Sequence, residues 1–246
     1  MDNISVAIIM PVYNCRDTLE RAIISVIMQT YENWHLYIIN DKSVDDLNDI
    51  LNSYKGNSKI SIIYNENNLG AASSRNIGLK LSCENIVAFI DSDDSWHSDK
   101  LMIQMQSIRK GYDVVISNYN FISSENNKII YHKDEVTIDD FIKKKIRICF
   151  SSLIHRKTKG LHFDKIGHED FLYIYNLLLK YGRVKIEREL LVDYYDVPGS
   201  LSNNKKKAAK WHFALLNKIY SRNKIKVYYY FLYYIANGII FKIKNR

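Results

Sequence analysis

The chain has few of the residues that break or cross-link a fold. Its 246 residues include two prolines, nine glycines and three cysteines. So little proline and glycine argues against a disordered or low-complexity protein. The cysteines, Cys15, Cys83 and Cys149, are odd in number and have no metal-binding spacing, so we assign them to packing in a reducing compartment. No cleavable signal peptide is expected, because Asp2 and Pro11 interrupt the first apolar residues.

Acidic residues are missing from the last fifty positions. Residues 197–246 contain eleven Lys or Arg and no Asp or Glu, whereas residues 1–196 hold 24 basic and 27 acidic residues. The net charge of +8 therefore belongs to the tail. A nucleic-acid enzyme would instead spread basic residues over its active face, so we expect no nucleic-acid partner.

Strand-like and helix-like segments alternate over the first ninety residues. Apolar runs predict strands at 4–10, 34–40, 59–64 and 86–90, and helical spacing predicts helices at 17–31, 45–54 and 71–81. This order predicts a parallel sheet with helical crossovers, whose first strand ends at Pro11. Further along we expect helices at 98–110, 141–145 and 168–179, strands at 113–117 and 148–155, a hairpin at 121–131, an extended segment at 184–195 and a turn at 198–202.

The apolar run at 86–90 ends in three carboxylates, Asp91, Asp93 and Asp94. Ligands of parallel α/β sheets bind at the carboxyl ends of the strands. Three acids within four residues repel one another, which favours a cation between them. Oxygen ligands select Mn²⁺ or Mg²⁺ rather than zinc. The alternative is an ordinary acidic turn that caps the next helix.

Five motifs follow one another in a defined order: residues 11–14 (Pro-Val-Tyr-Asn), 40–45, 68–78, 91–94 and 169–170. In this order and spacing, residues 4–202 resemble the inverting family 2 glycosyltransferases of the GT-A fold, of the bacterial surface-polysaccharide type. The resemblance implies an α/β fold with a mostly parallel central sheet flanked by helices. It also implies a glycosyltransferase domain at 1–203 and a helical tail at 204–246.

The resemblance assigns the donor, a UDP-sugar, to the first three motifs. Pro11 and Tyr13 would lie beside the base, and Asp41 would accept the uracil N3–H. Asp41 could otherwise cap a helix, although Ser43 or Asp45 is a better cap candidate. Arg75 would contact the base and phosphate side of the donor, because a planar, permanently charged fork suits that task.

The resemblance assigns the chemistry to the last two motifs. Asp93 would bind the ribose and share the metal with Asp94, and Asp91 would support both. Asp170, beside Glu169, would be the base that inversion requires on the opposite face of the sugar. Two acids in a first helical turn are also favoured by the helix dipole alone.

One position departs from the family pattern. Many members carry an arginine or histidine before the turn equivalent to 198–202, where this chain has Tyr-Tyr-Asp-Val at 194–197. Lysines 205–207 or His212 could supply that charge, or the metal and Arg75 could suffice. The gap is the best support for a rival function, a non-catalytic nucleotide-sugar or saccharide binding module. A nucleotidyltransferase would need a glycine-rich basic loop after the first strand, which residues 11–15 do not provide.

The function that we predict is metal-dependent, inverting transfer of a hexose to a lipid-linked saccharide. The acceptor would be one such as an undecaprenyl diphosphate-linked sugar in O-antigen, capsule or lipooligosaccharide synthesis. Glucose and galactose are the leading sugars, followed by GlcNAc and GalNAc.

The tail predicts where the enzyme works. Its uncharged run at 227–241 is short for a membrane span, and basic residues flank it. We expect a helix in the interface of the inner membrane, and hence a cytoplasmic enzyme peripheral on the inner face of that membrane. The alternative is a helical pair that packs on the domain or on a second copy, as in a homodimer.

Overall fold

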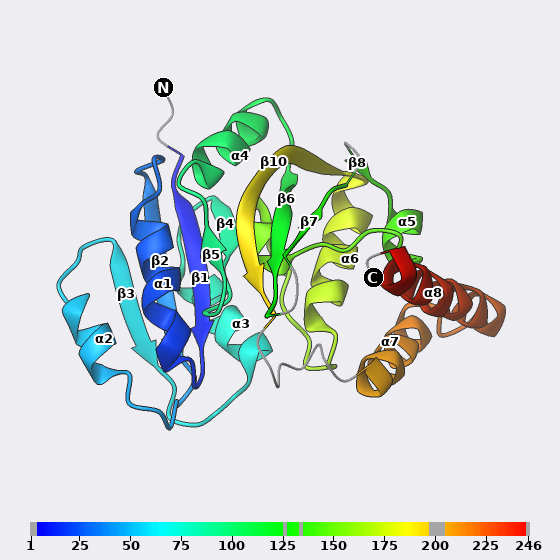
Figure 1. The fold of residues 1–246 in the computed structure, drawn as a ribbon, viewed down its shortest axis with the longest axis horizontal. Coiled ribbons are helices and arrows are strands. Elements are labelled where there is room, and N and C mark those ends of the chain that lie inside the picture. The colour runs from blue at the N-terminus through cyan, green and yellow to red at the C-terminus, as the bar shows by residue number, and fades with distance from the viewer. Residues whose placement is uncertain (1–3, 125–126, 133–134, 197–204, 245–246) are drawn as a thin grey trace.

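The computed structural model describes residues 4–124, 127–132, 135–196 and 205–244. Within them the centre is a mixed sheet in the order β3-β2-β1-β4-β9-β6-β10-β5, with β7 beside β6 and β8 beside β10 (Figure 1). The strands are β1 (Val6–Val12), β2 (Trp34–Asn40), β3 (Ile60–Tyr64), β4 (Ile86–Phe89), β5 (Ser95–Trp96), β6 (Val114–Ile122), β7 (Lys128–Ile130), β8 (Glu135–Val136), β9 (Ile154–Arg156) and β10 (Val184–Tyr195).

The predicted fold class is confirmed, and the sheet has two differently built halves. Strands β3, β2, β1 and β4 are all parallel, as the alternating apolar pattern predicts. Beyond β4 the sheet is mixed, because β9 runs antiparallel to both β4 and β6, whereas β6 and β10 are parallel. The hairpin at 121–131 is present as the antiparallel pair of β6 and β7.

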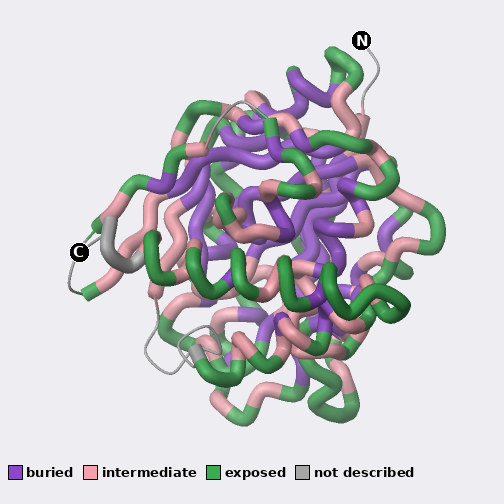
Figure 2. Tube along the Cα trace, turned by 90° about the vertical axis from the view of Figure 1, so that its right-hand side faces the viewer, coloured by how far each residue is buried: buried purple, intermediate pink, exposed green. Residues whose placement is uncertain are grey.

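Helices cover both faces of this sheet, and the strands between them are buried (Figure 2). On one face α1 (Arg16–Ile27), α2 (Asn48–Ser53) and α4 (Lys100–Arg109) bury Leu19, Leu51 and Leu101 in the same apolar cluster as the even-numbered residues of β1. On the other face lie α3 (Ala71–Leu81), α5 (Ile138–Ile142) and α6 (Glu169–Tyr181). Strands buried on both sides are uniformly apolar, which explains the runs seen in the sequence.

Two predictions about the strands are wrong. Pro11 does not end β1 but lies within it, opposite Ile39 of β2. Its ring is tolerated there because the pairing of β1 with β4 ends at Ile9 and Phe89, so no ladder bond on that side is lost. The strand expected at 148–155 is mostly a 3₁₀ turn (Phe150–Ser152) followed by the short β9. The turn expected at 198–202 lies outside the described residues.

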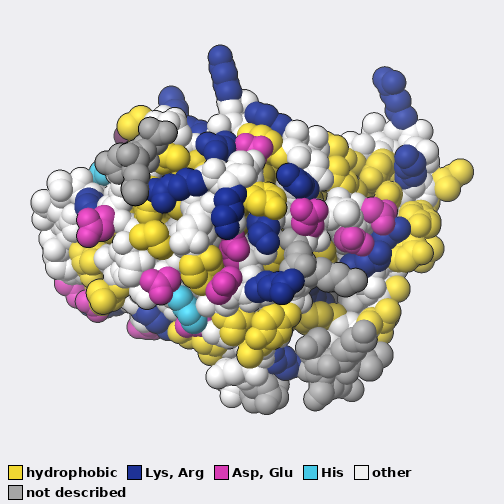
Figure 3. Space-filling view, turned by 90° about the horizontal axis from the view of Figure 1, so that it is seen from above, with side chains coloured by type: hydrophobic (Ala, Val, Ile, Leu, Met, Phe, Trp, Pro, Cys, Tyr) yellow, Lys and Arg dark blue, Asp and Glu magenta, His cyan; other side chains and the backbone are white. Residues whose placement is uncertain are grey.

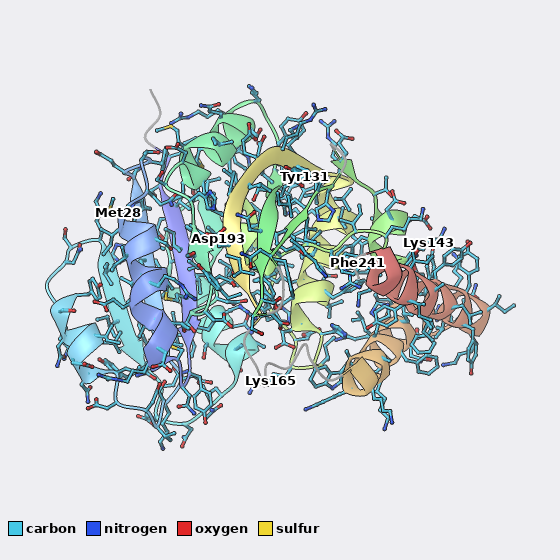
Figure 4. All side chains as sticks on the ribbon, viewed as in Figure 1. Met28, Tyr131, Lys143, Lys165, Asp193 and Phe241 are labelled. Atoms are coloured by element: carbon cyan, nitrogen blue, oxygen red, sulfur yellow. The ribbon has the colours of Figure 1, made fainter. Side chains whose placement is uncertain are left out.

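The tail forms two helices, α7 (Lys205–Ile219) and α8 (Lys224–Lys244), that pack on the domain. Leu215, Leu216 and Val227 are buried in the same cluster as α5 and α6. The amide of Asn237 donates to the carbonyl of Lys143 at 2.8 Å, and Figure 4 labels Lys143 beside α8. Packing on the domain, the alternative left open by the sequence, is therefore observed. No helix in the described part of the chain is long and apolar enough to cross a membrane.

Candidate functional site

The acidic turn follows β4 at the carboxyl edge of the sheet. The backbone N–H of Asp94 donates to the carbonyl of Asp91 at 3.0 Å, which closes the turn. The Asp94 side chain is buried, where Oδ1 accepts the Tyr195 N–H at 3.3 Å and Oδ2 accepts the hydroxyl of Ser151. Asp91 and Asp93 are partly exposed. The carboxylates of Asp91 and Asp93 thus remain partly accessible to solvent, whereas that of Asp94 is buried and held by Ser151 and Tyr195.

Crowding of these acids changes their titration. Burial and the Asp91 carboxylate raise the pKa of Asp93 to about 6, although Arg21 and Arg75 oppose the rise. Burial together with Asp91 and Asp93 raises the pKa of Asp94 well above its usual value. Bound positive charge would relieve both effects.

A hard divalent cation fits the oxygen atoms of this turn by their chemistry, because carboxylates are the ligands that Mg²⁺ and Mn²⁺ prefer. No group of three or more His, Cys, Asp or Glu side chains stands ready as a metal site in the described ranges.

Arg75 joins the acidic turn to α6. It extends from α3, is 4% exposed, and donates to Asp91 Oδ1 at 2.7 Å and to Asp170 Oδ1 at 2.8 Å. Burial opposes its charge, but the carboxylates of Asp170 and Asp91 raise its pKa. Arg75 therefore brings together two residues that are 79 positions apart in the sequence.

The rest of the α3 motif also has a structural explanation. The side-chain amide of Asn76 donates to the Phe163 carbonyl at 2.9 Å and accepts the Phe163 N–H at 2.8 Å, which holds the loop before α6. A Cβ on Gly78 would lie 2.6 Å from Cγ2 of Ile9. Only glycine lets α3 pack this closely on β1.

Glu169 and Asp170 form the first turn of α6. The Asp170 side chain is 44% exposed, and its Oδ1 accepts a hydrogen bond from Arg75. Partial desolvation raises its pKa to about 6, against the opposing charge of Arg75 and with smaller contributions from Asp91 and Glu169. Such a pKa suits a group that takes up a proton near neutral pH.

The tail holds the start of α6 in place. Gly167 has a φ of +80°, and a Cβ there would lie 2.4 Å from the Trp211 ring of α7. The next residue, His168, contacts the carbonyl of Ala208 through Nε2 at 3.1 Å. Helix α7 thus supports the loop that leads into α6, whose first turn carries Asp170.

The loops after β1 and β2 are bonded to each other. The N–H of Asn14, a residue in left-handed backbone (φ 50°), donates to Ser43 Oγ at 3.1 Å, and its side chain accepts the Val44 N–H at 2.9 Å. Tyr13 is 47% exposed beside them, and Pro11 is partly exposed. An aromatic ring is thus available at the edge where a base would stack.

Asp41 lies below this edge and is 2% exposed. Its oxygens accept the N–H groups of Leu69 at 2.9 Å and Gly70 at 2.7 Å, and the Asn65 amide at 2.7 Å. Asp41 therefore fixes the loop that leads into α3. Asp45, considered as a cap for the following helix, instead accepts the Arg16 N–H at 2.9 Å at the start of α1.

The sequence analysis missed Ser151 and Arg21. Ser151 Oγ donates to Asp94 and accepts the Asp91 N–H at 3.0 Å, so it holds both ends of the acidic turn. Arg21 of α1 donates to the Asp93 carbonyl at 2.6 Å, and its guanidinium lies 3.6 Å from the centre of the Tyr195 ring. Neither residue belongs to a local motif, because each reaches the turn only through the fold.

His212 is not the missing cation. It is buried and stacked on Tyr234 with ring centres 3.9 Å apart. Burial, with His168 and Lys144 nearby, lowers its pKa to about 2. Lys206 and Lys207 lie exposed on α7.

Comparison with known proteins agrees with this fold. The model of the family described as "Glycosyl transferase family 2" matches residues 7–171. Escherichia coli WfgD, a UDP-Glc:alpha-D-GlcNAc-diphosphoundecaprenol beta-1,3-glucosyltransferase, is 31% identical over 97% of this chain and 95% of its own. TuaG of Bacillus subtilis (strain 168), a glycosyltransferase assigned to teichuronic acid biosynthesis, is 32% identical over 95% of this chain and 96% of its own.

The solved structures agree in fold. TarS 1-349 of S. aureus in complex with UDP-GlcNAc superposes with a TM-score of 0.75 at 16% identity, over 97% of this chain and 73% of that one. The fold is therefore of the GT-A type. The chain belongs to glycosyl transferase family 2.

Proposed function

We propose that this family 2 glycosyltransferase moves a hexose, with inversion, from a UDP-sugar to a lipid-linked saccharide. The observation that carries the proposal is the ion-pair bridge of Arg75, which sets Asp170 opposite the acidic turn. WfgD, whose name specifies UDP-Glc and a diphosphoundecaprenol-linked acceptor, supports glucose and a lipid diphosphate as the first substrates to test.

Asp170 is the base of this reaction. Its carboxylate takes the proton of the acceptor hydroxyl while that oxygen bonds to the anomeric carbon. The bond from that carbon to the diphosphate breaks, and its electron pair leaves with UDP. Attack from the face opposite the leaving group inverts the configuration. Arg75 fixes the orientation of Asp170, and Glu169 precedes Asp170 in the first turn of α6.

Asp93 and Asp94, with Asp91 beside them, would hold Mn²⁺ or Mg²⁺. When bound, such an ion neutralises charge that develops on the leaving diphosphate. Asp93 also borders the position proposed for the ribose.

The uracil would stack on Tyr13 near Pro11 and donate its N3–H to Asp41. Three backbone and amide donors already fix the Asp41 carboxylate, and each of its oxygens can accept more than one bond. A preorganised acceptor of this kind selects uracil, because cytosine has no N3–H.

The reaction is tested by incubating the purified protein and Mn²⁺ with UDP-glucose and a GlcNAc-diphospho-lipid, followed by NMR of the product. We expect a β-glucoside from the α-linked donor. An α-linked product would contradict inversion, and absence of transfer from every UDP-hexose tried would contradict the proposed activity.

We further infer that α8 rests on the membrane that holds the acceptor. Figure 3 shows hydrophobic side chains gathered at the end of the molecule where α7 and α8 lie. The exposed apolar side chains of α8 recur every three or four residues along one face: Ile225, Tyr228, Tyr229, Leu232, Tyr233, Ile235, Ile239 and Ile240. Lysines but no acids accompany this stripe, which favours an anionic lipid surface over a second, equally basic copy.

Membrane docking of α8 is tested better by point variants than by truncation, because α7 and α8 contribute to the core. Leu232→Glu with Ile239→Glu should abolish flotation with phosphatidylglycerol vesicles. Met28→Glu, at an equally exposed apolar residue near the end of α1, should not. Unchanged flotation of the α8 variant would contradict membrane docking. A wild type that is dimeric while the α8 variant is monomeric would contradict it as well.

A further inference from the structure

Arg21 reaches the acidic turn from the face of the sheet opposite Arg75. It belongs to α1, whereas Arg75 belongs to α3. Arg21 Nη2 donates to the Asp93 carbonyl at 2.6 Å, and the guanidinium carbon lies over Tyr195, 3.6 Å from the ring centre. The Tyr195 N–H in turn donates to Asp94. Arg21 thus contacts both the turn and the end of β10.

The negative charges of the site exceed what Arg75 alone can balance, so a second positive side chain would stabilise a bound diphosphate. Both terminal nitrogens of Arg75 are already engaged, since they bind Asp91 and Asp170. Asp91, Asp93, Asp94 and Glu169 add further negative charge, and a nucleoside diphosphate would bring still more. Arg21 has no carboxylate partner among the described residues, and its Nη1 has no protein acceptor there. Its charge is therefore available to a ligand.

The contacts of the Arg21 guanidinium orient it for binding an anion. The contact with the Tyr195 ring and the bond from Nη2 to the Asp93 carbonyl restrain the guanidinium. A planar fork with a free nitrogen suits a phosphate oxygen. The segment 194–196 has no basic residue of its own, but Arg21 from the first helix lies over the ring of Tyr195 within it.

We propose that Arg21 binds the diphosphate of the donor beside Asp93. This inference rests on the proposed function, since it assumes a nucleoside diphosphate in the site. Arg21 thereby supplies, from α1, the positive charge that stabilises the departing diphosphate.

The test compares UDP with uridine, in Mn²⁺, on the wild type and on Arg21→Gln, Arg21→Lys and Arg109→Gln. Arg109 is the matched control, because it also lies over a tyrosine, Tyr31, at 5.8 Å, but is on α4 away from the acidic turn. We expect Arg21→Gln to weaken UDP about tenfold or more and uridine less than twofold, because the charge-assisted bond is made only to phosphate. The UDP affinity of Arg21→Lys should lie between those of the wild type and Arg21→Gln, and that of Arg109→Gln should equal the wild-type value.

If Arg21→Gln lowers the affinities for UDP and uridine equally, Arg21 only positions the turn. If it lowers neither affinity, Arg21 does not bind the nucleotide. Either result would overturn the inference. If Arg21→Gln does not fold, the same comparison on Arg21→Lys decides. Failure of the wild type to bind UDP would instead contradict the proposed function, so the two failures are distinguishable.

Discussion

Replacing Asp170 by asparagine is expected to lower kcat by about 10²–10⁴-fold, which is the usual contribution of a general base. The amide keeps the size of the side chain but cannot accept the acceptor proton. UDP affinity should stay within about twofold, because the nucleotide motifs lie on β1, β2 and α3. Glu169→Gln, one residue away in the same turn, is the matched control and should cost far less.

The pH profile provides a second measurement on Asp170. Partial desolvation raises its pKa to about 6, and only the ionised form can act as base. In the wild type, kcat should therefore fall as the pH drops through about 6 and level off above it. A rate for Asp170→Asn equal to that of the wild type, or an acid limb unchanged by this substitution, would contradict the assignment.

The second large effect is expected from Arg75→Gln. Arg75 is buried between Asp91 and Asp170, so its loss leaves two carboxylates without their counter-ion. Breaking a buried ion pair costs about 3–5 kcal/mol. We expect about 3 kcal/mol of unfolding free energy, the low end of that range, because the side chains of Asp91 and Asp170 are 29% and 44% exposed.

Catalysis should change with stability in this variant. Arg75 lowers the pKa of Asp170, so its removal should raise that pKa further and move the acid limb of kcat to higher pH. Arg75→Lys keeps the charge but not the two-pronged contact, and should lie between the wild type and Arg75→Gln. Urea unfolding and the pH profile check both points. A glutamine variant as stable as the wild type would contradict the bridge.

Much of the parallel half could be predicted from the sequence, since its signals are local. The bounds of β2 and α3 agree with the structure residue for residue. The tail was also predicted as helical. The prediction that Pro11 ends the first strand is wrong, because proline is tolerated there only where the pairing of β1 with β4 has ended. That is a property of the neighbouring strand, which the residues around Pro11 do not encode.

Site residues could be predicted where they directly follow a strand in the sequence. They could not be predicted where they reach the site only through contacts between distant elements. The acidic turn, Arg75 and Asp170 do lie together in the structure. Ser151 was missed because it lies 57 residues from Asp94 in a segment that reads as an ordinary strand. Arg21 was missed because one basic residue on an amphipathic helix resembles a solvated surface group. The sequence leaves His212 open as one source of the missing charge, and only the fold excludes it by showing that it is buried.

The central claim, a cation-assisted UDP-sugar site at the acidic turn, is tested most directly by calorimetric titration with UDP, with and without Mn²⁺. The wild type should bind UDP much more tightly with Mn²⁺ than without it. In Asp94→Asn, which keeps the side-chain volume, this difference should disappear. UDP binding that is equally strong without Mn²⁺ and in Asp94→Asn would contradict the metal assignment. Absence of binding under all of these conditions would contradict the nucleotide site itself.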